Sequence, residues 1–298
     1  MTTFSILGYI FFLLITPILY FIGLFNAKKF PDPRSILITG ASSGIGKTLA
    51  INYAAKGKVL FLTGRNKERL EEVVSLCQRK GARVEYTTID VTDREISEWI
   101  VDSDRKSPID LVIANAGVTE LVLPETMTYE EKLHRVNDVN VNGVLNTVMP
   151  LIPAFRERST GQIVVTGSIS YQVPLACPIY CATKSWVQCW CTSLRQELLP
   201  YGIGVTVLVP AFVRTPMSEA VPIANKPFEK TTDESVKIFM RDISSNKAFS
   251  CDNNAVLYLS SLFKVSPNLR DGWTFIQNKI YPEGNMDTYD YTSKKKNQ

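Results

Sequence analysis

Tyr180 and Lys184, in the stretch YCATK, form the pair of residues best suited to acid–base chemistry in this 298-residue chain. Residues four apart lie on one face of a helix, so the lysine ammonium would stand beside the phenol. The pKa of a free phenol is about 10, and a neighbouring cation favours the phenolate and lowers that value. Such a pair could give a proton to an alcohol oxygen or take one from it. By itself, the pair is equally compatible with an amphipathic helix that has no chemical role.

Ser168 lies twelve residues before Tyr180, at the end of the apolar stretch IVVTGS. If that stretch is a strand, the hydroxyl lies at the carboxyl edge of the sheet, where open α/β sheets bind their ligands. Ser170 is an alternative for the same position, and a loop or capping role is the alternative for either serine.

The stretch LITGASSGIGKT, residues 37–48, predicts a loop that binds a phosphate-bearing ligand. Its GKT end is similar to a nucleoside-triphosphate loop, but the glycine that such a loop needs is replaced by Ala41. The glycines present are Gly40, Gly44 and Gly46, between an apolar stretch and a helical pattern. This arrangement favours a dinucleotide whose pyrophosphate meets the helix N-terminus.

The elements that must position these residues alternate along the chain. Helical spacing follows at 44–56, 66–80 and 93–101, and apolar strand patterns occur at 35–40, 58–64, 82–90, 109–117, 161–168 and 202–210. Near-continuous Val, Ile and Leu indicate strands covered on both faces. We therefore expect one α/β domain, a doubly wound parallel sheet of the Rossmann type.

These motifs occur in the order and spacing of the short-chain dehydrogenase/reductase family, which the chain resembles in its classical subgroup over about residues 35–216. The matching motifs are TGASSGIG (39–46), NAG (115–117), VNVNG (139–143), Ser168, YCATK (180–184) and PAFVRT (210–215). The resemblance implies a catalytic tetrad of Asn140, Ser168, Tyr180 and Lys184.

In the roles implied by the resemblance, Tyr180 is the acid in reduction and the base in oxidation, and Ser168 binds the substrate oxygen. Lys184 lowers the phenol pKa and binds the nicotinamide ribose. Asn140, with Asn142 as the alternative, holds a water through its main-chain carbonyl. The implied cofactor-binding residues are Gly40, Ser42, Ser43, Gly44, Ile45, Gly46, Arg65, Asp90, Asn115, Tyr180, Lys184, Val213 and Thr215.

Four positions bear further on the cofactor. Asn115 resembles the asparagine that braces the central strand, and Asp90 the residue near the adenine ring. Arg65 stands where an enzyme specific for NAD usually has an acid, and a guanidinium suits the 2′-phosphate of NADP(H). An exposed loop arginine is the alternative. Ala211 departs from the family's Pro-Gly and places a methyl group near the nicotinamide carboxamide.

Residues 4–25 carry no charge and, at 1.5 Å per residue, could extend about 33 Å, enough for an N-terminal transmembrane helix. Pro17 leaves spanning and hairpin insertion open. Lys28 and Lys29 follow the segment, which predicts a cytosolic domain. Lys295 and Lys296 resemble a di-lysine signal for the endoplasmic reticulum. We therefore expect an anchor at 1–27, the dehydrogenase domain at 34–285 and a flexible basic tail at 286–298.

Composition excludes several other classes. The net charge of +4, without an arginine-rich run, argues against a nucleic-acid partner. Six cysteines and the single His134 show no metal-ligand spacing, so no metal site is expected. The four cysteines between Cys177 and Cys191 lie in one helical pattern and predict buried thiols in a reducing compartment.

We expect an NADPH-dependent reductase of a ketone or aldehyde on a lipid, similar to 3-ketosphinganine or acyl-dihydroxyacetone-phosphate reductases, at the endoplasmic-reticulum membrane. Its substrate would be covered by residues 216–245, whose apolar members are Met217, Val221, Ile223, Phe228, Ile238, Phe239 and Met240. The alternatives are an NAD(P)-dependent steroid or retinol dehydrogenase and a non-enzymatic, membrane-tethered binding module. The resemblance also allows a homodimer.

Overall fold

Seven parallel strands form one sheet in the order β3-β2-β1-β4-β5-β6-β7. The structure is a computed structural model, and it describes residues 11, 13–18, 29–172, 177–220, 226, 228–266, 268–269, 271–272 and 275–276. The strands are β1 (Ser35–Ile38), β2 (Val59–Thr63), β3 (Arg83–Thr87), β4 (Leu111–Ala114), β5 (Gln162–Thr166), β6 (Gly204–Val209) and β7 (Phe249–Cys251). The predicted parallel Rossmann-type sheet is confirmed.

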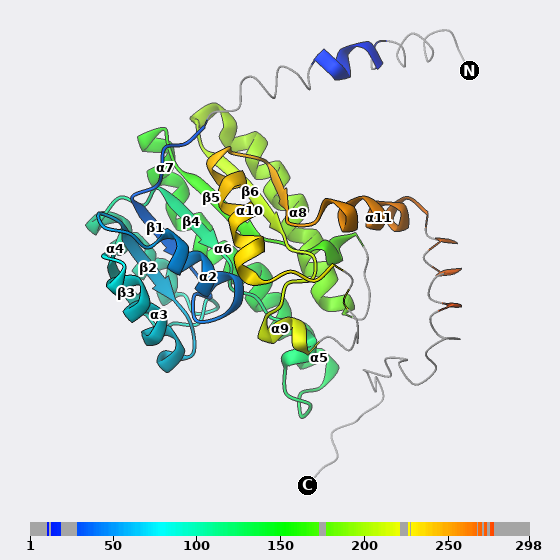
Figure 1. Cartoon of the computed structure of the whole chain (residues 1–298), viewed down its shortest axis with the longest axis horizontal. Helices are drawn as coiled ribbons and strands as arrows, with labels where there is room; N and C mark the ends of the chain where they lie inside the picture. The colour runs from blue at the N-terminus through cyan, green and yellow to red at the C-terminus, as the bar shows by residue number, and fades with distance from the viewer. Residues whose placement is uncertain are drawn as a thin grey trace.

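Helices cover both faces of this sheet (Figure 1). In the described residues the main helices are α2 (Gly44–Tyr53), α3 (Lys67–Arg79), α4 (Glu95–Lys106), α5 (Tyr129–Asn137), α6 (Gly143–Val148), α7 (Ile152–Arg158), α8 (Pro178–Leu198), α9 (Pro216–Glu219), α10 (Thr232–Ser244) and α11 (Asn254–Val265). Short helical segments are η1 (Glu120–Val122), η2 (Asp138–Asn142, a π-helix), η3 (Met149–Leu151), η4 (Ile169–Tyr171) and η5 (Leu199–Tyr201).

The alternation of side chains along each strand creates two cores. Leu37 and Phe61, which are paired in register on β1 and β2, face a core completed by α4, α6, α7 and α8. Their neighbours Ile36 and Leu60 face the opposite core, which α2, α3 and α10 complete. Strand β3 at the edge is partly exposed along its length. It is shorter than the predicted 82–90, since only Arg83–Thr87 pair with β2.

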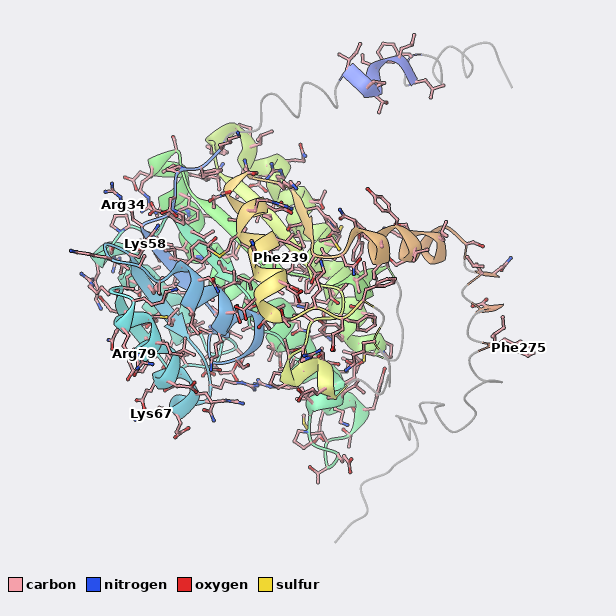
Figure 2. The ribbon with its side chains drawn as sticks, in the orientation of Figure 1. Arg34, Lys58, Lys67, Arg79, Phe239 and Phe275 are labelled. Atoms are coloured by element: carbon pink, nitrogen blue, oxygen red, sulfur yellow. The ribbon has the colours of Figure 1, made fainter. Side chains whose placement is uncertain are left out.

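The segment after β6 differs from the prediction. Residues 216–245 do not close over the substrate as one unit, because α10 packs against α2 and buries Phe239 completely in the core (Figure 2). Ile238 and Met240 lie on this same helix. Val221 and Ile223 lie outside the described residues. After α10 the chain adds strand β7, which the sequence patterns did not indicate because only three residues pair with β6.

Two of the sequence predictions concern the terminal segments, namely the membrane anchor and the di-lysine signal. Residues 13–18 are helical, and the remainder of the predicted anchor at 4–25, except residue 11, lies outside the described residues. Within the part of the chain that the structure describes, no helix is both long and apolar enough to cross a membrane. Lys295 and Lys296 also lie outside the described residues.

Candidate active site

A cavity of about 1010 Å³ lies at the carboxyl edge of the sheet. The loops after β1 and β4 line it, at the point where the strand order reverses and where doubly wound sheets bind ligands. Every predicted site residue lines the cavity except Gly46 and Asn140, which adjoin the lining residues Gly40 and Val118 respectively. The tertiary structure thus gathers residues from the ends of six strands, β1 to β6, and from α8 and α9 at one site.

The three glycines of the first loop are each required by geometry. Gly40 and Gly44 have φ values of +67° and +53°, a region that favours glycine. A Cβ on Gly46 would lie 2.3 Å from the Gly40 carbonyl oxygen, and one on Gly44 would lie 3.2 Å from a methyl carbon of Thr215. This loop leads into the N-terminus of α2, with Ser43 as N-cap. Such a cradle of bare backbone fits the pyrophosphate of a nicotinamide dinucleotide.

Asn115 braces the centre of the sheet edge, as the resemblance implied. Its Nδ2 donates to the carbonyl oxygen of Thr39 at 3.1 Å, and its Oδ1 accepts from the hydroxyl of Thr166 at 3.1 Å. The side chain therefore joins the ends of β1, β4 and β5, from which the cavity loops leave.

Tyr180 and Ser168 meet inside the cavity. Burial raises the pKa of Tyr180, the hydrogen bond with Ser168 opposes this, and Cys181, Cys177 and Glu120 add to the increase. The outcome differs from the expected lowering by Lys184, because removal of the phenol from water dominates. Ser168 Oγ also accepts from the amide of residue 170 at 3.2 Å, so the loop geometry selects Ser168 over Ser170 as the partner of the phenol.

Lys184 is almost completely buried, with 3% of its surface exposed. Its Nζ donates to the main-chain carbonyl of Thr166 at 2.7 Å and lies 5.4 Å from the ring centre of Tyr180. Burial lowers the pKa of Lys184 to about 8, and the thiol of Cys191 opposes this. The predicted Tyr–Lys pair on one helix face is therefore present, with the lysine held from below by β5.

Asn140 is fully buried and links the segment after β4 to the helix that carries Tyr180. Its Oδ1 accepts from the Val118 amide at 2.9 Å, and its Nδ2 donates to the Val118 carbonyl at 2.9 Å and to the Thr183 hydroxyl at 3.0 Å. The alternative, Asn142, is exposed and bonds Asp138 instead. Asn140 also lies in the π-helix η2. In a π-helix the hydrogen bonds join residues five apart instead of four, so the main-chain carbonyls here depart from the α-helical bonding pattern.

Basic side chains surround one end of the cavity. Arg65 follows β2, with its side chain 57% exposed and its Nη1 3.9 Å from Asp90 Oδ2. Arg69 on α3 lines the same end, and Gly64 lies so close to Ser42 that a Cβ there would be 2.9 Å from the serine Cβ. Burial acts to raise the pKa of Asp90, but hydrogen bonds from Arg135 and from the Thr92 amide outweigh it and lower the value.

The loop after β6 forms another wall. The amide of Ala211, the residue that replaces the family's glycine, donates to Asp252 Oδ1 at 2.8 Å. The buried carboxyl group of Asp252 therefore holds Ala211 in place. Val213 pairs with Lys230 in an isolated bridge, and Thr215 caps α9 by accepting from the Ser218 amide at 3.1 Å. These contacts hold the loop across from the glycine cradle.

The remaining wall is apolar and comes mainly from parts of the chain that sequence reasoning missed. Met217 and Phe228 line it, as expected from the predicted covering segment. Helix α11 contributes residues that were not foreseen, namely Val256, Leu259, Ser260 and Leu262.

Glu120 was also missed, although a single acid within the otherwise uncharged stretch VTELVL was a signal that could have identified it. Among the four clustered cysteines, Cys189 is exposed, unlike the expected buried thiols.

Comparison with known proteins gives consistent matches. Residues 34–226 match the short chain dehydrogenase family. An uncharacterized oxidoreductase of Myxococcus xanthus is 32% identical over 79% of this chain and 93% of that protein. An Arabidopsis thaliana protein named 11-beta-hydroxysteroid dehydrogenase-like 2 is 30% identical over 80% of this chain and 79% of that protein. The solved short-chain dehydrogenase from Sphingobium yanoikuyae, in complex with NADPH, is 29% identical with a TM-score of 0.68, over 80% of this chain and 94% of that one.

Proposed function

The chain belongs to the short-chain dehydrogenase family, and on this premise we propose that it is an NADPH-dependent reductase of a ketone or aldehyde on an apolar, lipid-like substrate. Its membership of the family makes it an NAD(P)-dependent oxidoreductase with a nicotinamide cofactor. The observation that carries the proposal is the meeting of Ser168, Tyr180 and Lys184 in one cavity with the glycine cradle.

The residues of the chain divide the chemistry between them. The nicotinamide supplies the hydride when it is bound. Tyr180, kept as a neutral phenol by burial, would donate its proton to the carbonyl oxygen, and Ser168 would hold that oxygen by a hydrogen bond. Lys184 would orient the cofactor ribose and assist the return of a proton to the phenol, while Asn140 would hold a water in the proton path.

Several features support a preference for NADPH. Arg65 and Arg69 line the cavity end beside Asp90. The two residues before Arg65 are a threonine and a glycine, so no acid stands at the end of β2. A guanidinium binds a phosphate through charge-assisted, bidentate hydrogen bonds, which suits an adenosine 2′-phosphate. The relative from Sphingobium yanoikuyae is described in complex with NADPH.

The apolar wall supports a hydrophobic substrate. Met217, Phe228 and the α11 residues named above form this wall, and the only cations among the described lining residues are Arg65, Arg69 and Lys184. A neutral ketone or aldehyde therefore fits the wall better than a substrate whose phosphate needs a cation of its own. This observation, with the name of the Arabidopsis relative, favours a second candidate function, a steroid or retinol dehydrogenase.

The proposal includes a place in the cell. The uncharged residues 4–25 would anchor the protein in the endoplasmic-reticulum membrane, and the lysines that follow would keep the domain in the cytosol. The domain would then span 34–285, with 286–298 as a flexible tail. A membrane location would bring the apolar wall close to lipid-dissolved substrates.

A substrate panel tests the proposal. The full-length protein in detergent would be assayed with NADPH or NADH against 3-ketosphinganine, an acyl-dihydroxyacetone phosphate, a ketosteroid and retinaldehyde. We expect turnover of an apolar carbonyl compound with NADPH preferred, and none in a Tyr180→Phe variant. Faster alcohol oxidation with NAD+ would favour the dehydrogenase candidate. Binding of the cofactor without turnover of any compound would contradict both and support a binding module.

A further inference from the structure

The first turn of α8 carries Tyr180 as its third residue, and two amides of this turn have no acceptor within the helix. The N-cap residue Cys177 makes no capping bond through its side chain, and Pro178 has no amide hydrogen. Cys181 is the first residue whose amide donates inside the helix, to the Cys177 carbonyl at 2.9 Å. The amides of Ile179 and Tyr180 therefore need an acceptor from elsewhere in the protein.

Glu120 of η1 provides that acceptor with both of its oxygens. Its Oε1 accepts from the Ile179 amide at 2.9 Å, and its Oε2 accepts from the Tyr180 amide at 3.1 Å. The hydroxyl of Thr119 donates to Oε2 at 3.2 Å. Glu120 is only 1% exposed, and a buried acid is tolerated when its oxygens are bonded and a helix N-terminus faces it.

We propose that Glu120 is a positioning residue, which fixes the first turn of α8, and with it the Tyr180 phenol, to the cavity-lining segment 115–119. The first turn of a helix is otherwise prone to fray, and a fraying turn would move the phenol relative to Ser168. Glu120 follows immediately on the segment that Asn115 and Asn140 hold in place. The inference rests on the proposed function only for the role of Tyr180.

The charge of Glu120 acts on the pKa of Tyr180, and this effect can be measured separately from the stability of the fold. The titratable groups that face Tyr180 are Glu120 from η1 and Cys177, Cys181 and Lys184 from the region of α8. Burial is the largest cause of the raised pKa of Tyr180, and Glu120 adds to it. A glutamine at position 120 would remove this charge. Its side-chain NH2 group would also face a main-chain N–H of α8, and two donors cannot form a hydrogen bond. The substitution should therefore loosen the turn and lower the phenol pKa together.

Full-length Glu120→Gln and Glu120→Ala variants test the proposal. The ionisation of Tyr180 is followed by near-ultraviolet absorbance, as the difference between each protein and its Tyr180→Phe counterpart at saturating NADP+. Turnover is measured with NADPH and para-nitrobenzaldehyde as the probe. We expect Tyr180 to ionise at lower pH in Glu120→Gln, and kcat to fall about 10- to 100-fold in Glu120→Ala with the Kd for NADPH within about threefold of the original.

The matched control is Glu234→Gln, because Glu234 also accepts hydrogen bonds at a helix N-terminus but is exposed on α10. It should change neither readout. Unchanged tyrosine ionisation and kcat in both Glu120 variants would overturn the proposal. If Glu120→Ala does not fold, Glu120→Gln decides by its kcat together with the titration. The titration does not depend on turnover. If the proposed carbonyl reduction is wrong, the parent protein will be inactive while its Tyr180 still titrates as expected, so the two failures can be told apart.

Discussion

The ammonium of Lys184 donates a 2.7 Å hydrogen bond to the main-chain carbonyl of Thr166, and so ties α8 to the end of β5. This bond gives a buried lysine one fixed partner below the cavity. It also keeps the lysine 5.4 Å from the ring centre of Tyr180, where it can act on the proposed proton donor and on a bound ribose.

The first prediction concerns stability and pH. The pKa of Lys184 is lowered to about 8, so above that pH the folded protein has released a proton that the unfolded chain keeps until its ordinary lysine pKa. The unfolded state then binds more protons, and the folded state gains stability as the pH rises from about 8 towards 10.5. Relative to Lys184→Met, the free energy of unfolding should rise by at most about 3 kcal/mol. Denaturant titrations across this range check it, and a flat difference would contradict it.

Removal of the Tyr180 hydroxyl should abolish turnover and spare cofactor binding. Tyr180→Phe deletes only the proposed proton donor, and general acid catalysis contributes about 100- to 10,000-fold to a rate. The ring and the cradle around Gly40 and Gly44 are unchanged, so the Kd for NADPH should stay within about twofold. Steady-state kinetics and fluorescence titration measure the two quantities. A variant that keeps more than about a tenth of kcat would show that Tyr180 is not the acid.

Arg65→Ala should discriminate between the two nicotinamide cofactors. The Arg65 side chain is partly exposed, and a charge-assisted contact there is worth about 1–3 kcal/mol, or roughly 5- to 150-fold in the Kd for NADPH. The affinity for NADH should hardly change, because NADH has no 2′-phosphate. Arg79→Ala at the far end of α3 is the control (Figure 2). Equal losses for both cofactors would refute the assignment of Arg65.

A methyl group on Gly46 should damage the glycine cradle. The new Cβ would lie 2.3 Å from the Gly40 carbonyl oxygen and 2.5 Å from Asn115 Nδ2, so backbone must shift. We expect Gly46→Ala to lose about 1–3 kcal/mol of stability and to bind NADPH far more weakly. Gly272→Ala is the control, since nothing lies within 4 Å of its Cβ. Thermal unfolding with and without NADPH compares the two, and similar behaviour would argue against the cradle.

Deletion of residues 1–27 should release a folded domain from membranes. The first strand begins at Ser35, and the amides of Arg34 and Ser35 both donate to Asp110 Oδ2, at 2.7 and 3.0 Å, so the fold is pinned after the deletion point. A longer deletion of residues 1–38 removes β1 and should unfold the protein. Fractionation and thermal unfolding measure both effects. A shortened protein that still sediments with membranes would contradict the proposed anchor.

The sequence by itself determined the elements whose signals are local. The alternation of strands and helices, the three glycines and the Tyr180–Lys184 spacing are local patterns, because glycine conformation and helix periodicity depend on neighbours along the chain. Each of these features has its predicted place in the structure, with ends that differ by a few residues. The strand–helix order also determined a parallel sheet, since right-handed crossovers leave few other arrangements.

Only the tertiary structure decided the features that depend on contacts between distant segments. Phe239 lies in the core against α2 and not in the cavity. The sequence shows that α10 has an apolar face, but it does not show which part of the protein that face packs against. Glu120 meets the first turn of α8 from 59 residues away. The direction of the Tyr180 pKa likewise depends on how deeply the phenol is buried, a three-dimensional property that outweighs the lysine one turn along the helix.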